Sequence, residues 1–284
     1  MKPAKFAYER ATSIDDAIRL LSAPGADARI IAGGQSLIPA LNFRLSAPPL
    51  LVDIAGIEQL REIRIEAGVL RIGAGTRHAD ILRSELIAHH APLMTTAAPF
   101  IAHPAIRNRG TLGGSLALAD PAAEWPACMV ALDARIVIAG PAGRREAAAV
   151  DFFQGVYSVD MAADEMIVEI RVPVANADEC FAFDEIARRH GDFAIAGLAL
   201  RWRGGASGTV RLVLFGVGDR PEPVDLPAAD VLAALRGGDS AGIVARAVEK
   251  LDPSADPYVS TEYRLHVARV LCERLLRRVM GDAS

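Results

Sequence analysis

The order of apolar and polar positions predicts helices and strands in alternation at the start of the chain. "IDDAIRLLS" predicts a helix capped by Ser13, and it is followed by a strand, "ARIIAGG", and by a second helix, "SLIPALNFRL". "LLVDI" predicts a second strand, buried on both faces. Farther on, "LREIRIEAG" and "VLRIGAG" predict a hairpin that turns at Gly68.

The pattern changes after "VPVANADE", which reads as a linker. Before it lie one or two helices, "HADILRSELIAHHAPLMTTAAPF", and two strands, "ARIVIAG" and "MIVEIRVPV"; beyond it lie three strands and then helices. We therefore expect an α+β protein with a domain over residues 1–175, divided into subdomains of about 1–56 and 57–175. A C-terminal α+β domain, residues 176–284, would hold a three-stranded antiparallel sheet with helices.

Composition narrows the class of protein. The chain has 284 residues, 51% of them hydrophobic and 23% charged, with a net charge of -4, which fits a globular protein with a sizeable core rather than a nucleic-acid binder. The three cysteines, Cys128, Cys180 and Cys272, are far apart, so this chain alone predicts neither an iron–sulfur cluster nor a structural zinc site. With no signal peptide or membrane helix in the pattern, we expect a cytoplasmic protein.

Three glycine-rich stretches are candidates for binding a phosphate, because successive backbone amides can form an anion nest. The first is "AGGQS" after the predicted strand, and the third is "TLGGS", followed by Asp120 and Glu124. The second, "GAGT", lacks the third glycine of a dinucleotide-binding fingerprint, so a Rossmann unit is a weak interpretation. The first loop alone is equally consistent with a tight turn that binds nothing. Two similar loops in one domain favour a ligand with two phosphates and many hydroxyl groups.

Other polar residues have plainer interpretations. His89 and His90 are neighbours on a predicted helix and would point to different faces, which argues against a shared metal site. Arg107 and Arg109 would contact a phosphate, an acidic partner or a structural carboxylate. Trp125 is expected to pack in the core.

Four stretches together resemble a known family. "AGGQSLIPALNFRLSAPPLLVDI", "IGAGTRHADI", "IAHPAIRNRGTLGGSLALADPAAEWPA" and "RRHGDFAIAG" are similar to the FAD-binding medium subunit of molybdenum hydroxylases, the xanthine dehydrogenase and carbon monoxide dehydrogenase family. The resemblance covers nearly the whole chain. It implies the vanillyl-alcohol-oxidase type of FAD-binding fold, with two α/β subdomains around an extended FAD and a C-terminal α+β domain beside them.

The resemblance also assigns parts of the FAD site. The first loop would wrap the pyrophosphate with backbone amides, and the third loop would form the wall nearer the ribityl chain and the flavin. Glu124 would accept a hydrogen bond from a hydroxyl group, Asp120 would do the same or cap the local turn, and Phe193 would stack beside the isoalloxazine ring. The implied cofactor-binding residues are Ala32, Gly33, Gly34, Gln35, Ser36, Leu37, Thr76, Ile101, Thr111, Leu112, Gly113, Gly114, Ser115, Asp120, Glu124 and Phe193.

The same resemblance implies partners. Molybdopterin would be held by a large subunit and two [2Fe-2S] clusters by a small one, in a dimer of heterotrimers. This chain would be the flavoprotein subunit of an oxidoreductase, passing electrons from the clusters through FAD to an external acceptor, with no catalytic acid or base and no metal ligand of its own. Two alternatives remain open: a self-sufficient FAD-dependent oxidase or reductase of the same fold, and a non-catalytic nucleotide-binding subunit.

Overall fold

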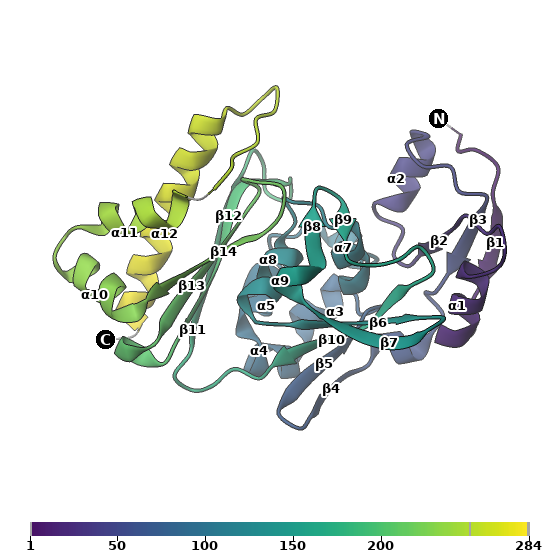
Figure 1. Ribbon diagram of the computed structural model, residues 1–284, viewed down its shortest axis with the longest axis horizontal. Helices are drawn as coiled ribbons and strands as arrows, with labels where there is room; N and C mark the ends of the chain where they lie inside the picture. The colour runs from purple at the N-terminus through teal and green to yellow at the C-terminus, as the bar shows by residue number, and fades with distance from the viewer. Residues whose placement is uncertain (1, 250, 283–284) are drawn as a thin grey trace.

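The structure is a computed structural model that describes residues 2–249 and 251–282. Sheets of three, five and four strands follow one another along the chain, with helices beside each large sheet. A two-stranded ribbon is inserted before the last strand of the five-stranded sheet. Figure 1 shows the three large sheets in chain order along the long axis of the molecule. The α+β class predicted from the sequence is confirmed.

The N-terminal sheet is parallel, with the strand order β1-β3-β2. Ser13 caps the first helix as predicted, since its hydroxyl oxygen accepts a hydrogen bond from the amide of Asp16 at 3.0 Å. The sequence did not predict β1, whose four residues are all exposed and carry no alternating pattern. The elements of this part are β1 (Ala7–Arg10), α1 (Ile14–Leu21), β2 (Ala28–Ile31), α2 (Leu37–Asn42) and β3 (Leu50–Asp53).

The central sheet is antiparallel throughout, in the order β4-β5-β10-β6-β7. The predicted hairpin is present, and its turn places Ala67 and Gly68 at positive φ, 51° and 74°. The elements of this part are η1 (Glu58–Arg61), β4 (Ile63–Glu66), β5 (Val69–Gly73), α3 (His78–Arg83), α4 (Glu85–His90), α5 (Pro92–Ala97), α6 (Pro104–Arg107), α7 (Leu112–Leu118), α8 (Glu124–Ala131), β6 (Arg135–Gly140), β7 (Gly143–Ala148), α9 (Ala149–Phe152), β8 (Phe153–Gly155), β9 (Ser158–Val159) and β10 (Met166–Pro173).

Two details of the central part differ from the prediction. The stretch expected to form one or two helices forms three, α3 to α5, because Ser84 caps α4 by accepting the amide of Ile87 at 3.3 Å and Pro92 begins α5. The rings of His89 and His90, expected on different faces of their helix, lie edge to face with centroids 4.6 Å apart. Within the described residues no group of three or more His, Cys, Asp and Glu side chains is arranged to hold a metal ion.

The C-terminal sheet has four strands in the order β11-β12-β13-β14, so the prediction of three strands was wrong. The missed strand β14 contains Pro223 and Pro227, which cannot donate to a ladder; it lies at the edge of the sheet, where prolines are tolerated. The elements are β11 (Cys180–Ala187), β12 (Ala194–Arg203), η2 (Gly205–Ser207), β13 (Thr209–Phe215), β14 (Glu222–Pro227), α10 (Ala228–Arg236), α11 (Ser240–Val248) and α12 (Thr261–Asp282).

Helix α8 joins the central part to the C-terminal sheet. All eight of its residues are buried, and it contacts β12 and β13 on one side and α5 and α7 on the other. One face of the C-terminal sheet, with Phe183, Ala199 and Phe215, belongs to the same apolar core as α8. The opposite face packs on α10, α11 and α12 in a separate core. No helix in the described parts of the chain is long and apolar enough to cross a membrane.

Candidate FAD site

The first glycine loop leaves the carboxyl end of β2. Gly34 takes a left-handed φ of +71°, which a side chain would strain. A Cβ on Gly33 would lie 2.1 Å from the carbonyl oxygen of Arg109, so only glycine lets this loop approach the loop before α7. Gln35 closes the turn by donating from Nε2 to the carbonyl oxygen of Gly33 at 3.0 Å. Leu37 begins α2, and the side chain of Ser36 is exposed.

The third glycine loop is built around Thr111. Its hydroxyl oxygen accepts a hydrogen bond from the amide of Gly114 at 3.2 Å and thereby caps α7. A Cβ on Gly113 would lie 2.6 Å from the Cβ of Ala74. This glycine therefore lets α7 start directly against the second glycine loop. Leu112 is fully buried beneath it, whereas Gly114 is exposed and Ser115 is half-buried.

The second glycine loop completes the arrangement. Gly73 and Gly75 both approach Leu60, and a Cβ on Gly73 would lie 2.4 Å from its carbonyl group. Gly73 ends a strand of the antiparallel sheet, so the loop does not belong to the βαβ unit that a Rossmann fingerprint requires. Thr76 is 1% exposed, and its hydroxyl has no hydrogen-bond partner among the described residues.

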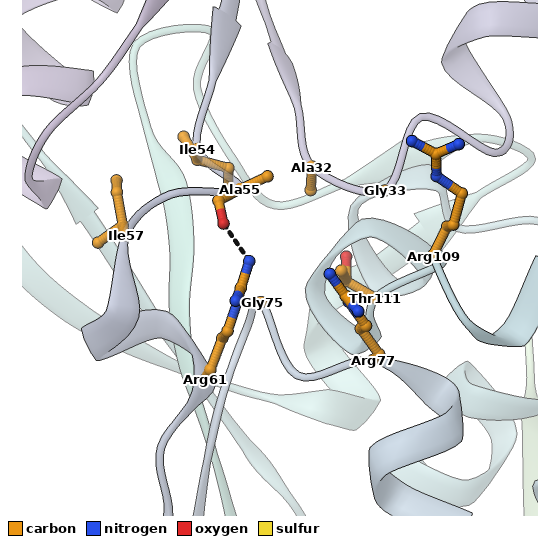
Figure 2. A pocket seen from close by; sticks show the side chains of 10 residues that line it. All are labelled: Ala32, Gly33, Ile54, Ala55, Ile57, Arg61, Gly75, Arg77, Arg109 and Thr111. Atoms are coloured by element: carbon orange, nitrogen blue, oxygen red, sulfur yellow. Dashed lines mark hydrogen bonds between the residues drawn. The ribbon is translucent and has the colours of Figure 1, made fainter.

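The three loops surround one cavity of about 110 Å³. Figure 2 shows Ala32 and Gly33 on one side and Arg77 and Thr111 on the facing loops. The lining residues are Ala32, Gly33, Ile54, Ala55, Ile57, Arg61, Gly75, Arg77, Arg109 and Thr111. Three of these carry guanidinium groups and none carries a carboxylate, in a chain whose net charge is -4. The cavity is therefore suited to an anion, and arginine matches phosphate oxygens in geometry as well as charge.

Half of this lining was not predicted from the sequence. Ile54, Ala55 and Ile57 follow β3, which lies parallel to β2, so the ends of the two strands meet at one edge of the sheet. Because both strands were predicted from the sequence, the proximity of their carboxyl ends could also have been predicted. No feature of the sequence indicated that Arg61 and Arg77 line the cavity, because the order of polar and apolar residues does not show where an exposed side chain points. Arg61 donates to the carbonyl oxygen of Ala55, another residue of the lining (Figure 2).

The remaining predicted residues lie outside this cavity. Ile101 is buried, and Phe193 is 66% exposed. A Cβ on Gly191, whose φ is +85°, would lie 3.0 Å from the carbonyl group of Ala102. The turn that carries Phe193 therefore rests against the segment that follows Ile101, and the exposed ring is free to stack on a flat partner.

Asp120 and Glu124 lie at the start of α8. Asp120 caps the local turn, one of its two predicted roles, by accepting the amide of Ala122 at 2.9 Å; it also accepts the hydroxyl of Tyr157 at 3.1 Å. Glu124 is 8% exposed. Burial, aided by the charge of Asp120, raises the pKa of Glu124 to about 7.

Three residues that could suggest chemistry have structural roles. Trp125 is fully buried, as predicted, and donates from Nε1 to Nδ1 of His78 at 3.0 Å. Burial, together with the charge of Arg107, lowers the pKa of His78 to about 4, so this imidazole is neutral at pH 7. Arg107 itself donates to the carbonyl oxygens of Pro99, Ile101 and Ala102, and so stabilises the loop rather than a carboxylate.

Comparison with known proteins agrees with this geometry. Residues 4–175 match the family described as the FAD binding domain in molybdopterin dehydrogenase, and residues 181–279 match the CO dehydrogenase flavoprotein C-terminal domain. The chain belongs to the family of molybdopterin dehydrogenase FAD subunits. The family is the one that the resemblance in the sequence indicated.

Relatives within this family cover the chain from end to end. The 6-hydroxypseudooxynicotine dehydrogenase complex subunit alpha of Paenarthrobacter nicotinovorans is 42% identical over 100% of this chain and 97% of its own. The caffeine dehydrogenase subunit beta of Pseudomonas sp. (strain CBB1) is 37% identical over 98% of this chain and 96% of its own. A solved structure of quinoline 2-oxidoreductase from Pseudomonas putida 86 matches with a TM-score of 0.90 at 35% identity, covering 100% of this chain and 99% of that one.

The residues of this family member fit an FAD. The glycines at 33, 73 and 113 are sites where a side chain would collide with a neighbouring loop, and they hold the three loops around a cationic cavity suited to a phosphate. The unpartnered hydroxyl of Thr76 lies on the second of these loops. A dinucleotide is far longer than the cavity, so the rest of the cofactor would extend along the protein from it.

Proposed function

We propose that this chain is the FAD-carrying electron-transfer subunit of a molybdenum hydroxylase. When bound, FAD would accept electrons from two [2Fe-2S] clusters of a small partner subunit and release them to an external acceptor. Substrate oxidation would take place on a large molybdopterin subunit, in a dimer of heterotrimers. The observation that carries the proposal is the cavity formed by three glycine loops and three arginines without a carboxylate.

Within this proposal the chain's residues bind and orient the cofactor. Gly33, Gly34 and Ser36 would present backbone amides to the pyrophosphate, and Arg61, Arg77 and Arg109 would neutralise its charge. The loop from Thr111 to Ser115 would form the wall toward the ribityl chain, although Thr111 already uses the amide of Gly114. Thr76 and Ile101 would contact the cofactor, and Phe193 would stack on its ring.

We further propose that residues 1–175 form the FAD-binding domain and residues 176–284 a second domain. Both faces of the C-terminal sheet are covered within the chain, one by α8 and the other by α10 to α12. This packing leaves neither face of the sheet to form a substrate pocket of its own, which favours the electron-transfer role over a self-sufficient oxidase.

The Gly33→Ala variant tests the cavity. Its added methyl group would lie 2.1 Å from the carbonyl oxygen of Arg109, so the first and third loops must move apart. We expect FAD affinity, measured by quenching of flavin fluorescence, to fall at least about tenfold, the equivalent of about 1.4 kcal/mol.

Gly25→Ala is the matched control. Gly25 also takes a positive φ, +75°, but nothing lies within 4 Å of its added Cβ, and it lies outside the cavity. This variant should lose some stability through backbone strain and bind FAD as the parent does. An unchanged FAD affinity in Gly33→Ala would show that the cavity is not the cofactor site.

A further inference from the structure

One carboxyl group on the C-terminal sheet lacks a partner. Glu185 lies on β11, and its Oε2 atom is buried without a hydrogen-bond partner among the described residues. Side chains alternate along a strand, so Glu185 shares a face with Phe181 and Phe183. Phe183 belongs to the core that contains α8. Glu185 therefore faces the FAD-binding part of the chain, away from α12.

The strand register brings Glu185 to the start of α8. Glu185 pairs with Gly197 on β12, and Gly197 pairs with Phe215 on β13. The next residue, Gly216, donates its amide to the carbonyl oxygen of Pro121 at 2.8 Å, and Pro121 lies just before α8. This row of the sheet therefore lies beside the end of α8 that begins with Glu124.

The far end of α8 supports this placement. Asp133, just after the helix, accepts from Arg201 at 3.0 Å and also from Arg211; Arg201 and Arg211 form another row of the same sheet face. Four strand residues separate Arg201 from Gly197, a rise of about 13 Å, and nine residues of helix rise about the same distance. The helix thus runs along the sheet with Asp133 at one row and Glu124 at the other.

The groups around Glu185 are acidic or apolar. Cys128 lies one turn from Glu124 on α8, is fully buried, and has its pKa raised by burial and by the charges of Glu124 and Glu185. Gly197 has no side chain, and the Phe215 ring covers it so closely that a Cβ there would lie 2.1 Å from the ring.

Within the described parts of the chain, the neighbouring acids and elements supply no free cation to this site. Asp120 is the other carboxylate at the start of α8, and Tyr157 donates to it. Asp184 points to the opposite face of the sheet and accepts from Arg274 of α12 at 2.9 Å, with Arg278 at 3.9 Å. Helix α5, which also packs on β11, has no titratable side chain from Pro92 to Ala97.

We propose that Glu185 is a positioning residue for Glu124: the two carboxyl groups hold one proton between them, and this proton fixes Glu124 as the acceptor for a cofactor hydroxyl. Glu185 is the donor of the pair, since its buried Oε2 atom has no other hydrogen-bond partner among the described residues, and Glu124 keeps its second oxygen for the ligand. This inference rests on the proposed function, because it takes Glu124 to be an FAD contact.

The protonation states of the pair agree with this arrangement. Burial is the main cause that raises the pKa of Glu185 to about 9, and the charges of Glu124 and Asp184 add to it. Glu124, with a pKa of about 7, is the one that ionises first. Because the two groups interact, the protons leave in two steps that belong to the pair. Loss of the second proton would place two carboxylates side by side near an anionic cofactor, which disfavours its binding.

The test measures FAD affinity as a function of pH, with the full chain purified with the partners it retains and stripped of FAD. In the parent, affinity should stay nearly constant from about pH 7 to pH 8 and then fall about tenfold between about pH 8 and pH 10, as the pair loses its last proton. Glu185→Gln keeps the hydrogen-bond donor and cannot ionise, so its affinity should stay flat over this range. Near and above pH 9, FAD binding by the parent should also take up protons from the buffer, and binding by Glu185→Gln should not.

Glu124→Gln is the second variant, and it allows the inference to be tested even if Glu185→Gln does not fold. It should bind FAD more weakly at every pH, and the pH dependence should disappear because the pair no longer exists. Equal pH profiles for the parent and Glu185→Gln would overturn the inference and leave the proposed function intact. Absence of FAD binding by the parent at every pH would instead overturn the proposed function.

Discussion

The two ends of α8 meet the same sheet through opposite chemistry. At the end of the helix, Asp133 accepts hydrogen bonds from Arg201, Arg203 and Arg211, and Arg201 also binds Glu179 at 2.7 Å. At its start, Glu124 is proposed to pair with Glu185, whose buried Oε2 atom has no hydrogen-bond partner among the described residues. One contact joins opposite charges, and the other joins two acids.

This comparison indicates that the ion-paired end of α8 stabilises the fold, whereas the acidic end supports the candidate FAD site. Opposite charges with satisfied hydrogen bonds join the two parts of the chain at any pH near neutrality. A buried acid beside a half-buried one costs stability unless the two hold a proton, and a fold keeps such a pair where something else benefits from it. Here one member of the pair, Glu124, begins α8, the helix that follows the helix of the third glycine loop and packs against it.

The largest expected effect is at the ion-paired end. In Glu179→Gln, the buried guanidinium of Arg201, whose side chain is 7% exposed, loses the carboxylate of a side chain that is 1% exposed. We expect the free energy of unfolding to fall by about 3 kcal/mol, because a buried charge is left without its main partner. Urea denaturation measures this. A loss below about 0.5 kcal/mol would mean that this contact does not hold the fold together.

The second largest effect is expected for Glu185→Gln at the acidic end of α8, where the free energy of unfolding should depend on pH. Glu185 has its pKa raised from 4.5 to about 9, so between these values the folded chain holds a proton that the unfolded chain has released. The contribution of Glu185 to stability is therefore greatest below pH 4.5 and falls as the pH rises toward 9, by up to about 1.4 kcal/mol per pH unit. In Glu185→Gln the curve of unfolding free energy against pH should be flatter by this slope.

Glu179→Gln serves as the control for that slope. The same change from carboxylate to amide at the other end of α8 should lower stability at every pH and leave the slope as in the parent. If both variants flattened the slope alike, the pH dependence would not come from the acidic pair.

The smallest expected effect comes from Asp133→Asn. The side chain of Asp133 is 39% exposed, so water and salt screen its ion pairs with Arg203 and Arg211. We expect a loss of about 1 kcal/mol at low salt that shrinks at high salt, measured by urea denaturation under both conditions. If Asp133→Asn lowered the free energy of unfolding as much as Glu179→Gln does, and by the same amount at low and high salt, the exposed Asp133 would contribute as much as the buried Glu179. The expected difference between buried and exposed partners would then be wrong.

The sequence predicted what depends on local chemistry. Ser13 as a cap, the turn at Gly68, the buried Trp125 and the two glycine loops follow from residue types at fixed spacing. The resemblance that these loops helped to carry also indicated the family to which the chain belongs.

The features that the sequence did not predict depend on which segments of the chain lie side by side in the fold. In the sequence, Glu185 is one polar residue in a predicted strand. The register that pairs it with Gly197, and from which we infer that it lies near the start of α8, is visible only in the fold. Arg61 and Arg77 line the cavity only because η1 and the second glycine loop meet there. Strand β14 was not predicted because it contains two prolines, which argue against a strand in the interior of a sheet. At the edge of a sheet, where β14 lies, prolines are tolerated.

The most direct test of the electron-transfer proposal is the visible spectrum of this chain purified with its partners, before and after denaturation. The account predicts flavin absorbance, release of FAD on denaturation, and iron–sulfur absorbance that stays with a companion subunit. A complete complex without flavin would contradict it, because the three glycine loops would then be turns that bind nothing. Flavin on the isolated chain with substrate turnover would contradict the electron-transfer role and indicate a self-sufficient oxidase.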